Sequence, residues 1–143
     1  MPMDQDDAPA QAERISQART AQSQALLEDY TELIDDLMRA EGEARITDIA
    51  RQMGVTHPTA AKAVARLKRE GLAVSRPYRG VFLTDAGTEM AERVRLRHRV
   101  VVDLLVAVGV PADAAEIDAE GIEHHVSQAT LEAFEAFLDR RGS

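Results

Sequence analysis

The sequence predicts a mainly α-helical protein with a small β-wing, in which an N-terminal winged helix-turn-helix domain precedes a C-terminal helical domain. Two observations carry this prediction. Apolar residues recur with helical spacing through most of the 143-residue chain, and the pattern changes only where two short strand-like runs enclose residues 77–80. Aromatic residues make up only 3% of the chain and tryptophan is absent. A core of aliphatic side chains with few rings favours packed helices.

The first helix is preceded by a polar stretch. Residues 1–22 are acidic and polar, and we expect them to form a disordered tail. From Ser23 the apolar positions recur at helical spacing, which predicts an amphipathic helix that ends before Gly42. These positions are Leu26, Leu27, Tyr30, Leu33, Ile34, Leu37 and Met38.

A helix-turn-helix pattern comes next. Residues 47–53 form a short amphipathic segment, which is followed by a tight turn that contains Gly54. A second helix is predicted over residues 57–70, with Pro58 at an early position, where the missing N–H costs little, and Gly71 as the terminator. Two helices joined by such a turn are typical of this motif. The apolar positions of the second helix are Ala61, Val64, Ala65 and Leu67.

A β-hairpin is predicted directly after this second helix. Residues 72–76 are typical of a strand, residues 77–80 of a turn, and residues 81–84 of a returning strand. A hairpin in this position is a wing. The order of helix, helix and hairpin is the strongest structural signal in the sequence.

The remainder of the chain is predicted to be helical. Thr84 caps a long helix that continues to about residue 108, and two shorter helices cover about residues 112–126 and 128–140. We therefore divide the chain into three parts. These are a disordered tail (1–22), a winged helix-turn-helix domain (23–84), and a long linking helix followed by a helical domain (85–143).

Charge is segregated along the chain, although the net charge is −8. Residues 45–79 carry 8 basic and 2 acidic side chains, whereas residues 1–44 carry 3 basic and 11 acidic ones and residues 101–143 carry 2 and 9. A basic island between acidic flanks suits an electrostatic contact with DNA. Chance clustering on solvated helix faces gives the same pattern, so the island alone does not decide the partner.

Composition argues against a membrane or secreted protein. The longest apolar run, around residues 100–110, is broken by Asp103 and Gly109, so no membrane span is expected. The acidic N-terminus is unlike a signal peptide. The chain has no cysteine for a disulfide framework or a thiolate metal site. We therefore expect a cytoplasmic protein with no membrane partner.

The helix predicted over residues 57–70 is placed to enter a major groove of DNA, with the wing beside it. Residues near its N-terminus are placed toward base edges, and basic residues farther along and on the wing are placed toward bases or phosphates. Any single one of them has an alternative role as a solvated surface residue, but as a group they favour double-stranded DNA as the partner. The expected contacts are Thr56, His57, Thr59, Ala60, Lys62, Arg66, Arg76 and Arg79.

Oxygen and imidazole side chains gather on single faces of the predicted helices. Two acids on the first helix are three residues apart, and two acids and a histidine on a later helix stand at i, i+3 and i+4. With one histidine on the long helix, the set is Asp29, Glu32, Glu120, Glu123, His124 and His98. Four carboxylates and two imidazoles suffice for two hard divalent ions, and the lack of sulfur favours Mn(II), with Zn(II) and Fe(II) chemically possible. Taken singly, these acids are also compatible with ordinary solvated helix faces.

The spacing excludes a di-metal enzyme. Helical bundles with such centres use two Glu-x-x-His pairs, whereas Glu120 and His124 are four residues apart and His98 has Arg95 three residues before it. We expect no enzymatic activity and no small-molecule substrate. Two alternatives stay open: a winged-helix regulator that senses iron or a small organic ligand, and a winged helix used for protein contacts.

Five segments resemble the diphtheria-toxin-repressor (DtxR) family, and in particular its short manganese-sensing members. The resemblance extends over about residues 26–138. The last of the five, together with His98 and Asp29, is specific, whereas a winged helix alone is not. The segments are residues 28–32 (EDYTE), 46–50 (ITDIA), 78–84 (YRGVFLT), 97–98 (RH) and 120–125 (EGIEHH).

This resemblance implies a homodimeric repressor of manganese uptake genes, with a C-terminal metal-binding and dimerisation domain. It implies two Mn(II) ions per subunit at the domain junction, held by the six residues above, with Glu32 and Glu123 as bridges. Iron-sensing relatives carry Met at the position of Asp29 and Cys at that of Glu123, so the hard oxygens here point to manganese. Longer members add an SH3-like domain, and we expect the form without it.

Overall fold

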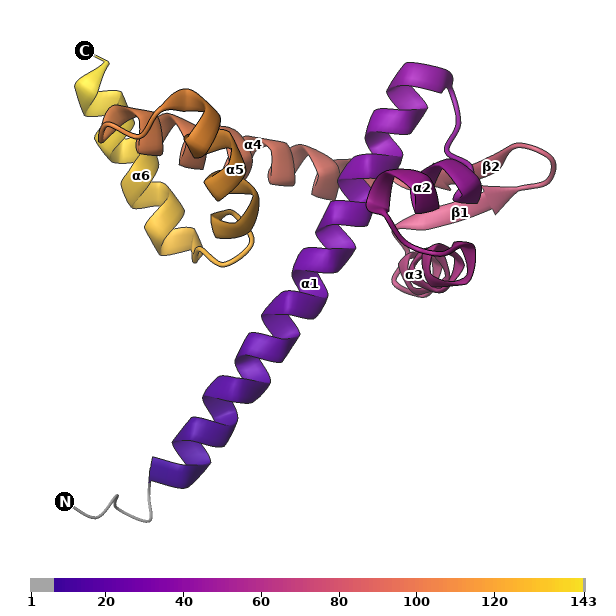
Figure 1. Cartoon of the computed structure of the whole chain (residues 1–143), viewed down its shortest axis with the longest axis horizontal. Coiled ribbons are helices and arrows are strands. Elements are labelled where there is room, and N and C mark those ends of the chain that lie inside the picture. Colours follow the sequence, from indigo (N-terminus) through magenta and orange to yellow (C-terminus); the bar gives the residue numbers. More distant parts are fainter. Residues whose placement is uncertain (1–6, 143) are drawn as a thin grey trace.

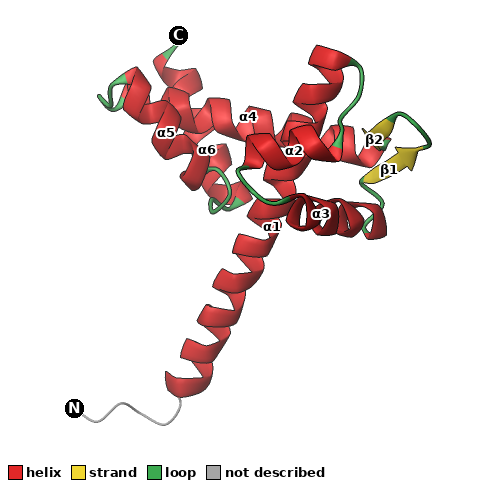
Figure 2. Cartoon of the chain, turned by 45° about the vertical axis from the view of Figure 1, so that its right-hand side comes forward, coloured by secondary structure: helices red, strands yellow, loops and turns green. Residues whose placement is uncertain are grey.

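The computed structural model describes residues 7–142, with side chains from residue 10 onward (Figure 1). In this range the chain forms six helices and one two-stranded sheet (Figure 2), which confirms the predicted mainly α-helical fold with a small wing. The elements are α1 (Asp7–Glu41), α2 (Ile46–Met53), α3 (His57–Arg69), β1 (Ala73–Arg76), β2 (Gly80–Leu83), α4 (Asp85–Ala107), α5 (Ala112–Ile122) and α6 (Gln128–Arg141). None of these helices combines the length and apolar character needed to cross a membrane.

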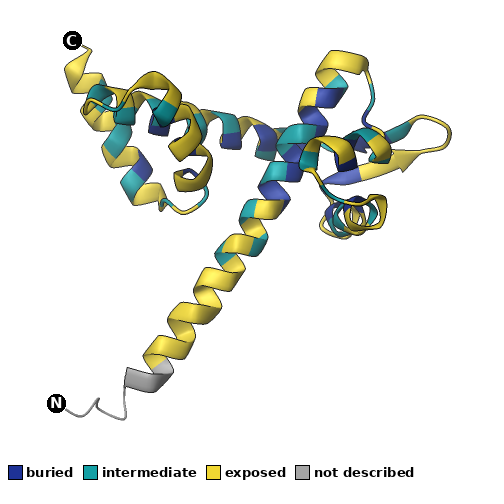
Figure 3. Ribbon diagram, in the orientation of Figure 1, coloured by how far each residue is buried: buried dark blue, intermediate teal, exposed yellow. Residues whose placement is uncertain are grey.

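Helix α1 begins much earlier than the sequence pattern predicts. Residues 7–22 belong to α1, so the expectation of a disordered tail is wrong for them, and residues 1–6 lie outside the described part of the chain. This stretch is rich in Ala, Gln and Arg, which favour helix even on an exposed segment. It extends from the body as a single exposed helix, and burial begins only where α1 meets the winged-helix domain (Figures 1 and 3).

The core of the winged-helix domain lies where α1, α2, α3 and the sheet meet (Figure 3). Strands β1 and β2 pair antiparallel, with Val74 opposite Phe82. An isolated β-bridge joins Ala44 to β2, and in it the Val81 N–H donates to the Ala44 carbonyl at 2.7 Å. The largest fully buried apolar side chains here are those of Tyr30, Ile34, Ile49, Val64, Leu67 and Val81.

The buried face of α3 is rotated from the predicted one. Ala60, Val64 and Leu67 are buried, at i, i+4 and i+7, whereas Ala65 is exposed and Ala61 is half-buried. The helix carries alanine at four of its thirteen positions, so apolar periodicity alone does not fix which alanines face the core. The side of α3 that faces outward follows from this rotation.

Helix α4 joins the wing to the C-terminal helices α5 and α6 (Figure 1). The Thr84 hydroxyl caps it by accepting the Gly87 N–H at 3.2 Å, and it donates to the Gly71 carbonyl at 2.6 Å. A Cβ at Gly87 would lie 2.1 Å from the Leu72 carbonyl oxygen, so only glycine lets the first turn of α4 pack this closely on the chain that leads into β1.

Ion pairs hold α1 against α4 between the two domains. The Arg95 guanidinium donates to Asp35 and to Asp36, each at 2.5 Å, and Arg97 pairs with the buried Glu28 carboxylate. These contacts place the middle of α1 next to the segment of α4 that carries His98.

Candidate metal centre and nucleic-acid interface

The six predicted metal ligands come from three parts of the fold. Asp29 and Glu32 lie on α1, His98 lies on α4, and the other three lie at the end of α5. Helix α5 ends at Ile122, four residues earlier than predicted, because the chain turns there toward α6, which is capped by Ser127. Glu120, Glu123 and His124 still lie together although the helix ends early. Glu123 keeps a helical backbone conformation and donates its N–H to the Ala119 carbonyl at 3.0 Å, and His124 lies in the turn that follows.

Glu123 lies at the centre of the cluster and is only 1% exposed. One of its carboxylate oxygens, Oε2, is 2.5 Å from His98 Nδ1, and the other, Oε1, is 3.4 Å from His124 Nε2. Glu120 Oε1 lies 3.6 Å from His98 Nδ1, and Asp29 Oδ1 lies 2.7 Å from His124 Nε2. The two histidines and three of the acids therefore share one connected set of donor atoms.

Glu32 completes the set from α1. Its side chain lines one surface cavity together with Asp29 and Glu120, and a second cavity together with His98 and Glu116. Its Oε2 atom is buried and has no hydrogen-bond partner among the described residues. The structure thus brings all six predicted ligands to the junction of α1, α4 and α5.

Burial and neighbouring charges shift the pKa values in this cluster. Burial raises the pKa of Glu123 to about 7, even though the imidazole of His98 opposes the shift. Burial, followed by repulsion from Glu120, raises the pKa of Glu32. Burial lowers the pKa of His98, but its hydrogen bonds to Glu116 and Glu123 outweigh this effect and the pKa is raised. The Asp29 carboxylate raises the pKa of His124. Protons thus offset the crowding of acids in the metal-free cluster.

The residues fit a hard divalent cation. All donor atoms are carboxylate oxygens or imidazole nitrogens, the set that suits Mn(II), Fe(II) or Zn(II) without sulfur. Two buried atoms that face the cluster, Glu32 Oε2 and His124 Nε2, make no hydrogen bond within the described residues. His124 Nε2 is close to Asp29 but is not aligned for a hydrogen bond. A buried polar atom without a hydrogen bond is costly, and a cation bound in the cluster would give these atoms a partner.

Sequence reasoning missed two acids that border the cluster. Glu28 is only 4% exposed, and Glu116 Oε2 lies 2.7 Å from His98 Nε2. Each had a signal. Glu28 is in phase with the buried positions Thr31 and Asp35 on α1, and Glu116 stands one helical turn before Glu120.

The predicted DNA interface is exposed on the outer face of α3 and on the wing. His57, Thr59 and Lys62 are exposed side chains near the beginning of α3. Thr56, also exposed, is the N-cap of α3, and its hydroxyl oxygen accepts the Thr59 N–H at 3.3 Å. The Thr56 hydroxyl therefore caps the N-terminus of α3, in addition to any contact that it makes with DNA.

The wing tip carries the two predicted arginines. The guanidinium groups of Arg76 and Arg79 lie 4.6 and 5.3 Å from the ring centroid of Phe82, and both side chains are exposed. Tyr78 between them is fully exposed and has a positive φ of 63°. The Phe82 ring thus holds two cations at the end of the hairpin.

Two predicted DNA contacts are corrected. Ala60 is 0% exposed, because it belongs to the buried face of α3, so it does not face a base edge. Arg66 is turned toward α1, where its Nη1 donates to the Ser23 hydroxyl at 2.6 Å and to the Ser23 carbonyl at 3.2 Å, and its Nε lies 3.5 Å from Glu70. Arg66 therefore anchors α1 to α3, a role set by a partner 43 residues away in the sequence.

Comparison with known proteins agrees with this geometry. The family described as the iron dependent repressor N-terminal DNA binding domain matches residues 24–81, and the iron dependent repressor metal binding and dimerisation domain matches residues 84–142. The chain is 47% identical over 131 residues to the transcriptional regulator MntR of Escherichia coli O6:H1, which covers 92% of this chain and 84% of that protein. It is 36% identical over 106 residues to the regulator MntR of Listeria welshimeri, which covers 74% and 75% of the two chains.

A solved structure of the manganese regulator SloR is also similar, with a TM-score of 0.69 and 30% identity. The match covers 79% of this chain and 53% of that one, so this chain spans about half the length of the SloR chain. The two family matches place a DNA-binding domain before a metal-binding and dimerisation domain in this chain. The protein belongs to the iron-dependent repressor (DtxR) family and is a relative of the MntR transcriptional regulators.

Proposed function

We propose that this protein is a Mn(II)-responsive repressor of transcription that binds operator DNA as a homodimer and controls manganese uptake genes. The observation that carries the proposal is the convergence of four carboxylates and two imidazoles from both domains at one junction. Two Mn(II) ions per subunit would be held by Asp29, Glu32, His98, Glu120, Glu123 and His124. The names of the relatives, which include manganese regulators, support the choice of metal.

The charges of the cluster explain how metal would control DNA binding. Four carboxylates from α1 and α5 face one another, and their repulsion opposes a fixed contact between the domains unless protons or cations offset it. When bound, two divalent ions supply positive charge at this point. Two of the acids have positions that suit bridging ligands. The two oxygens of Glu123 face different histidines, and Glu32 lines both of the cavities described above.

A fixed domain junction matters because a dimer must present two copies of α3 to DNA at once. Successive major grooves on one side of DNA are about 34 Å apart, so a pair of recognition helices binds tightly only at that separation. The cluster residues join α1, which packs against α3, to the C-terminal helices. Metal therefore favours one arrangement of the dimer, and by linkage DNA tightens metal binding in turn.

Exposed apolar residues support self-association of the C-terminal domain. Ile117 is 74% exposed, Val108 is 62% exposed and Ile122 is 37% exposed, and all three belong to the region that the family description assigns to dimerisation. Burial of these side chains against a second copy of the chain would stabilise a dimer. On the DNA side, we propose contacts by His57, Thr59, Lys62, Arg76 and Arg79, with Thr56 at the helix start.

Retention of genomic DNA tests this function. Sheared DNA from the source organism is passed over the immobilised protein, first with a chelator and then with Mn(II), and the retained fragments are sequenced. We expect a few palindromic fragments to be enriched only with Mn(II). Equal retention under both conditions would leave a winged-helix DNA-binding protein that does not sense manganese.

A further inference from the structure

Each histidine of the metal centre has one ring nitrogen toward the ligand cluster and the other toward an outer carboxylate. In His98, Nδ1 faces Glu123 at 2.5 Å, and Nε2 faces Glu116 at 2.7 Å. In His124, Nε2 faces Asp29 at 2.7 Å, and Nδ1 faces Glu28 at 3.6 Å. The two rings use opposite nitrogens, but the arrangement of inner and outer acids is the same.

This arrangement bears on metal binding because a neutral imidazole has one N–H and one lone pair. A ligand histidine must keep its lone pair on the nitrogen that faces the metal, and an acceptor at the other nitrogen fixes the N–H there. The outer acid also holds the plane of the ring. We infer that Glu116 and Glu28 are positioning residues, which hold His98 with its proton on Nε2 and His124 with its proton on Nδ1. This inference rests on the proposed metal-sensing function.

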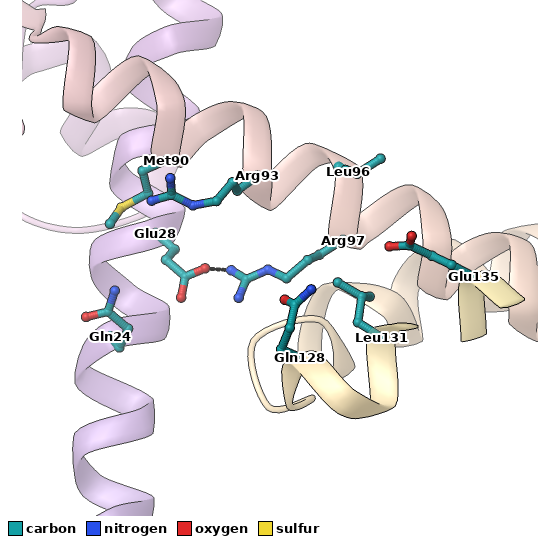
Figure 4. Close-up of a pocket in the computed structure, with 9 residues that line it drawn as sticks. All are labelled: Gln24, Glu28, Met90, Arg93, Leu96, Arg97, Gln128, Leu131 and Glu135. Atoms are coloured by element: carbon teal, nitrogen blue, oxygen red, sulfur yellow. Dashed lines mark ion pairs between the residues drawn. The ribbon is translucent and has the colours of Figure 1, made fainter. Parts of the chain in front are cut away.

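Glu28 is the stronger of the two positioning residues because it is buried. Its carboxylate is paired with Arg97 of α4 (Figure 4), so the buried acid is held in place by a cation from the neighbouring helix. Glu28 Oε2, the oxygen that Arg97 contacts, also lies 3.6 Å from His124 Nδ1. His124 Nδ1 is buried and makes no hydrogen bond within the part of the chain that the structure describes, so this carboxylate is the acceptor nearest to it among the ion pairs of His124 Nδ1.

Glu116 acts in a wetter environment. Its side chain is 60% exposed, whereas that of His98 is 22% exposed. Water competes for the Nε2 proton of His98 at this position, so loss of the carboxylate is partly replaced by solvent. The structure therefore predicts a graded effect, with Glu28 more important than Glu116.

The test compares Glu28→Gln and Glu116→Gln with matched controls. Asp35→Asn removes the charge of another buried acid that joins α1 to α4, here through Arg95, without contact to a histidine. Asp118→Asn removes an exposed acid from α5 itself. Mn(II) affinity is measured without DNA, and the histidine ring nitrogens are observed by NMR in the full-length protein loaded with diamagnetic Zn(II).

We expect Mn(II) affinity to fall by about 10–100-fold in Glu28→Gln, the range typical of such outer partners, and less in Glu116→Gln. In the wild type, NMR is expected to show slowly exchanging ring protons on Nδ1 of His124 and Nε2 of His98. Each variant should shift and expose only the proton of its own histidine, and the controls should shift neither.

Two results would overturn the inference. One is the opposite proton position in either histidine of the wild type, which needs no variant and so does not depend on the folding of Glu28→Gln. The other is Mn(II) affinity in both glutamine variants equal to that of their controls. A wild-type protein that binds no Mn(II) at all would instead refute the proposed function.

Discussion

Replacement of Glu123 by glutamine is expected to lower Mn(II) affinity by more than about 100-fold, beyond the range typical of outer partners. The two oxygens of Glu123 face different histidines, at 2.5 and 3.4 Å, so this one carboxylate serves both halves of the cluster. An amide keeps the shape but offers a single neutral oxygen. Operator binding should become insensitive to Mn(II) in the concentration range that activates the wild type. Calorimetric titration of Mn(II) and a DNA-binding assay measure the two effects.

The same substitution should not unfold the metal-free protein. Burial raises the pKa of Glu123 to about 7, above its value of 4.5 in the unfolded chain, so the ionised acid costs stability as the pH rises through this interval. A neutral amide avoids that cost, and the thermal midpoint without metal should be equal or higher. Glu132→Gln, an exposed acid on α6, serves as the control. Unchanged Mn(II)-dependent DNA binding in Glu123→Gln would refute the assignment of the site.

Charge reversal by Lys62→Glu is expected to weaken operator binding strongly while Mn(II) affinity stays the same. Lys62 is exposed on the outer face of α3, between the helix start and the last turn, and a homodimer presents it twice. Loss of a contact of this kind costs about 1–3 kcal/mol per subunit, and a negative charge near phosphates adds repulsion. Together these effects correspond to a loss of at least ~30-fold in DNA affinity.

A matched control for this variant is Arg93→Glu, an equal change of charge on α4, outside α3 and the wing. DNA binding should be measured at several salt concentrations, because loss of a phosphate contact also lowers the slope of affinity against salt by about one per site. If both variants bind the operator as the wild type does, α3 is not the recognition helix.

Local sequence patterns were sufficient for the order of elements and for naming the acids and histidines that meet at the junction of α1, α4 and α5. Helical and strand periodicities gave the order of elements from α2 to α6, and the spacing of Glu120, Glu123 and His124 survived even though α5 ends at Ile122. These cluster residues could be named because each group lies on one short helical segment. Their convergence depends on how α1 packs against α4, which the resemblance to a family supplied and spacing alone did not.

The features that the sequence did not predict depend on distant partners or on weak local signals. Arg66 is held by Ser23 through tertiary packing, so its loss from the DNA-facing surface has no local signal. Ala60 and Ala61 are both apolar, and only the packing of α3 against its neighbours decides which one is buried. The N-terminal part of α1 carries one large apolar side chain, Ile15, so it lacks the apolar stripe by which the rest of α1 was recognised.

In the proposed function, Mn(II) binding at the cluster and DNA binding by α3 are thermodynamically coupled. The most direct test is calorimetric titration of Mn(II) into the full-length protein, with and without an operator duplex recovered from the genomic selection. We expect Mn(II) to bind more tightly with the duplex, by the same factor by which Mn(II) tightens DNA binding and in the range of about 5–150-fold. Equal Mn(II) affinity with and without the duplex would contradict it, because the cluster at the junction of α1, α4 and α5 would then have no influence on the recognition helices.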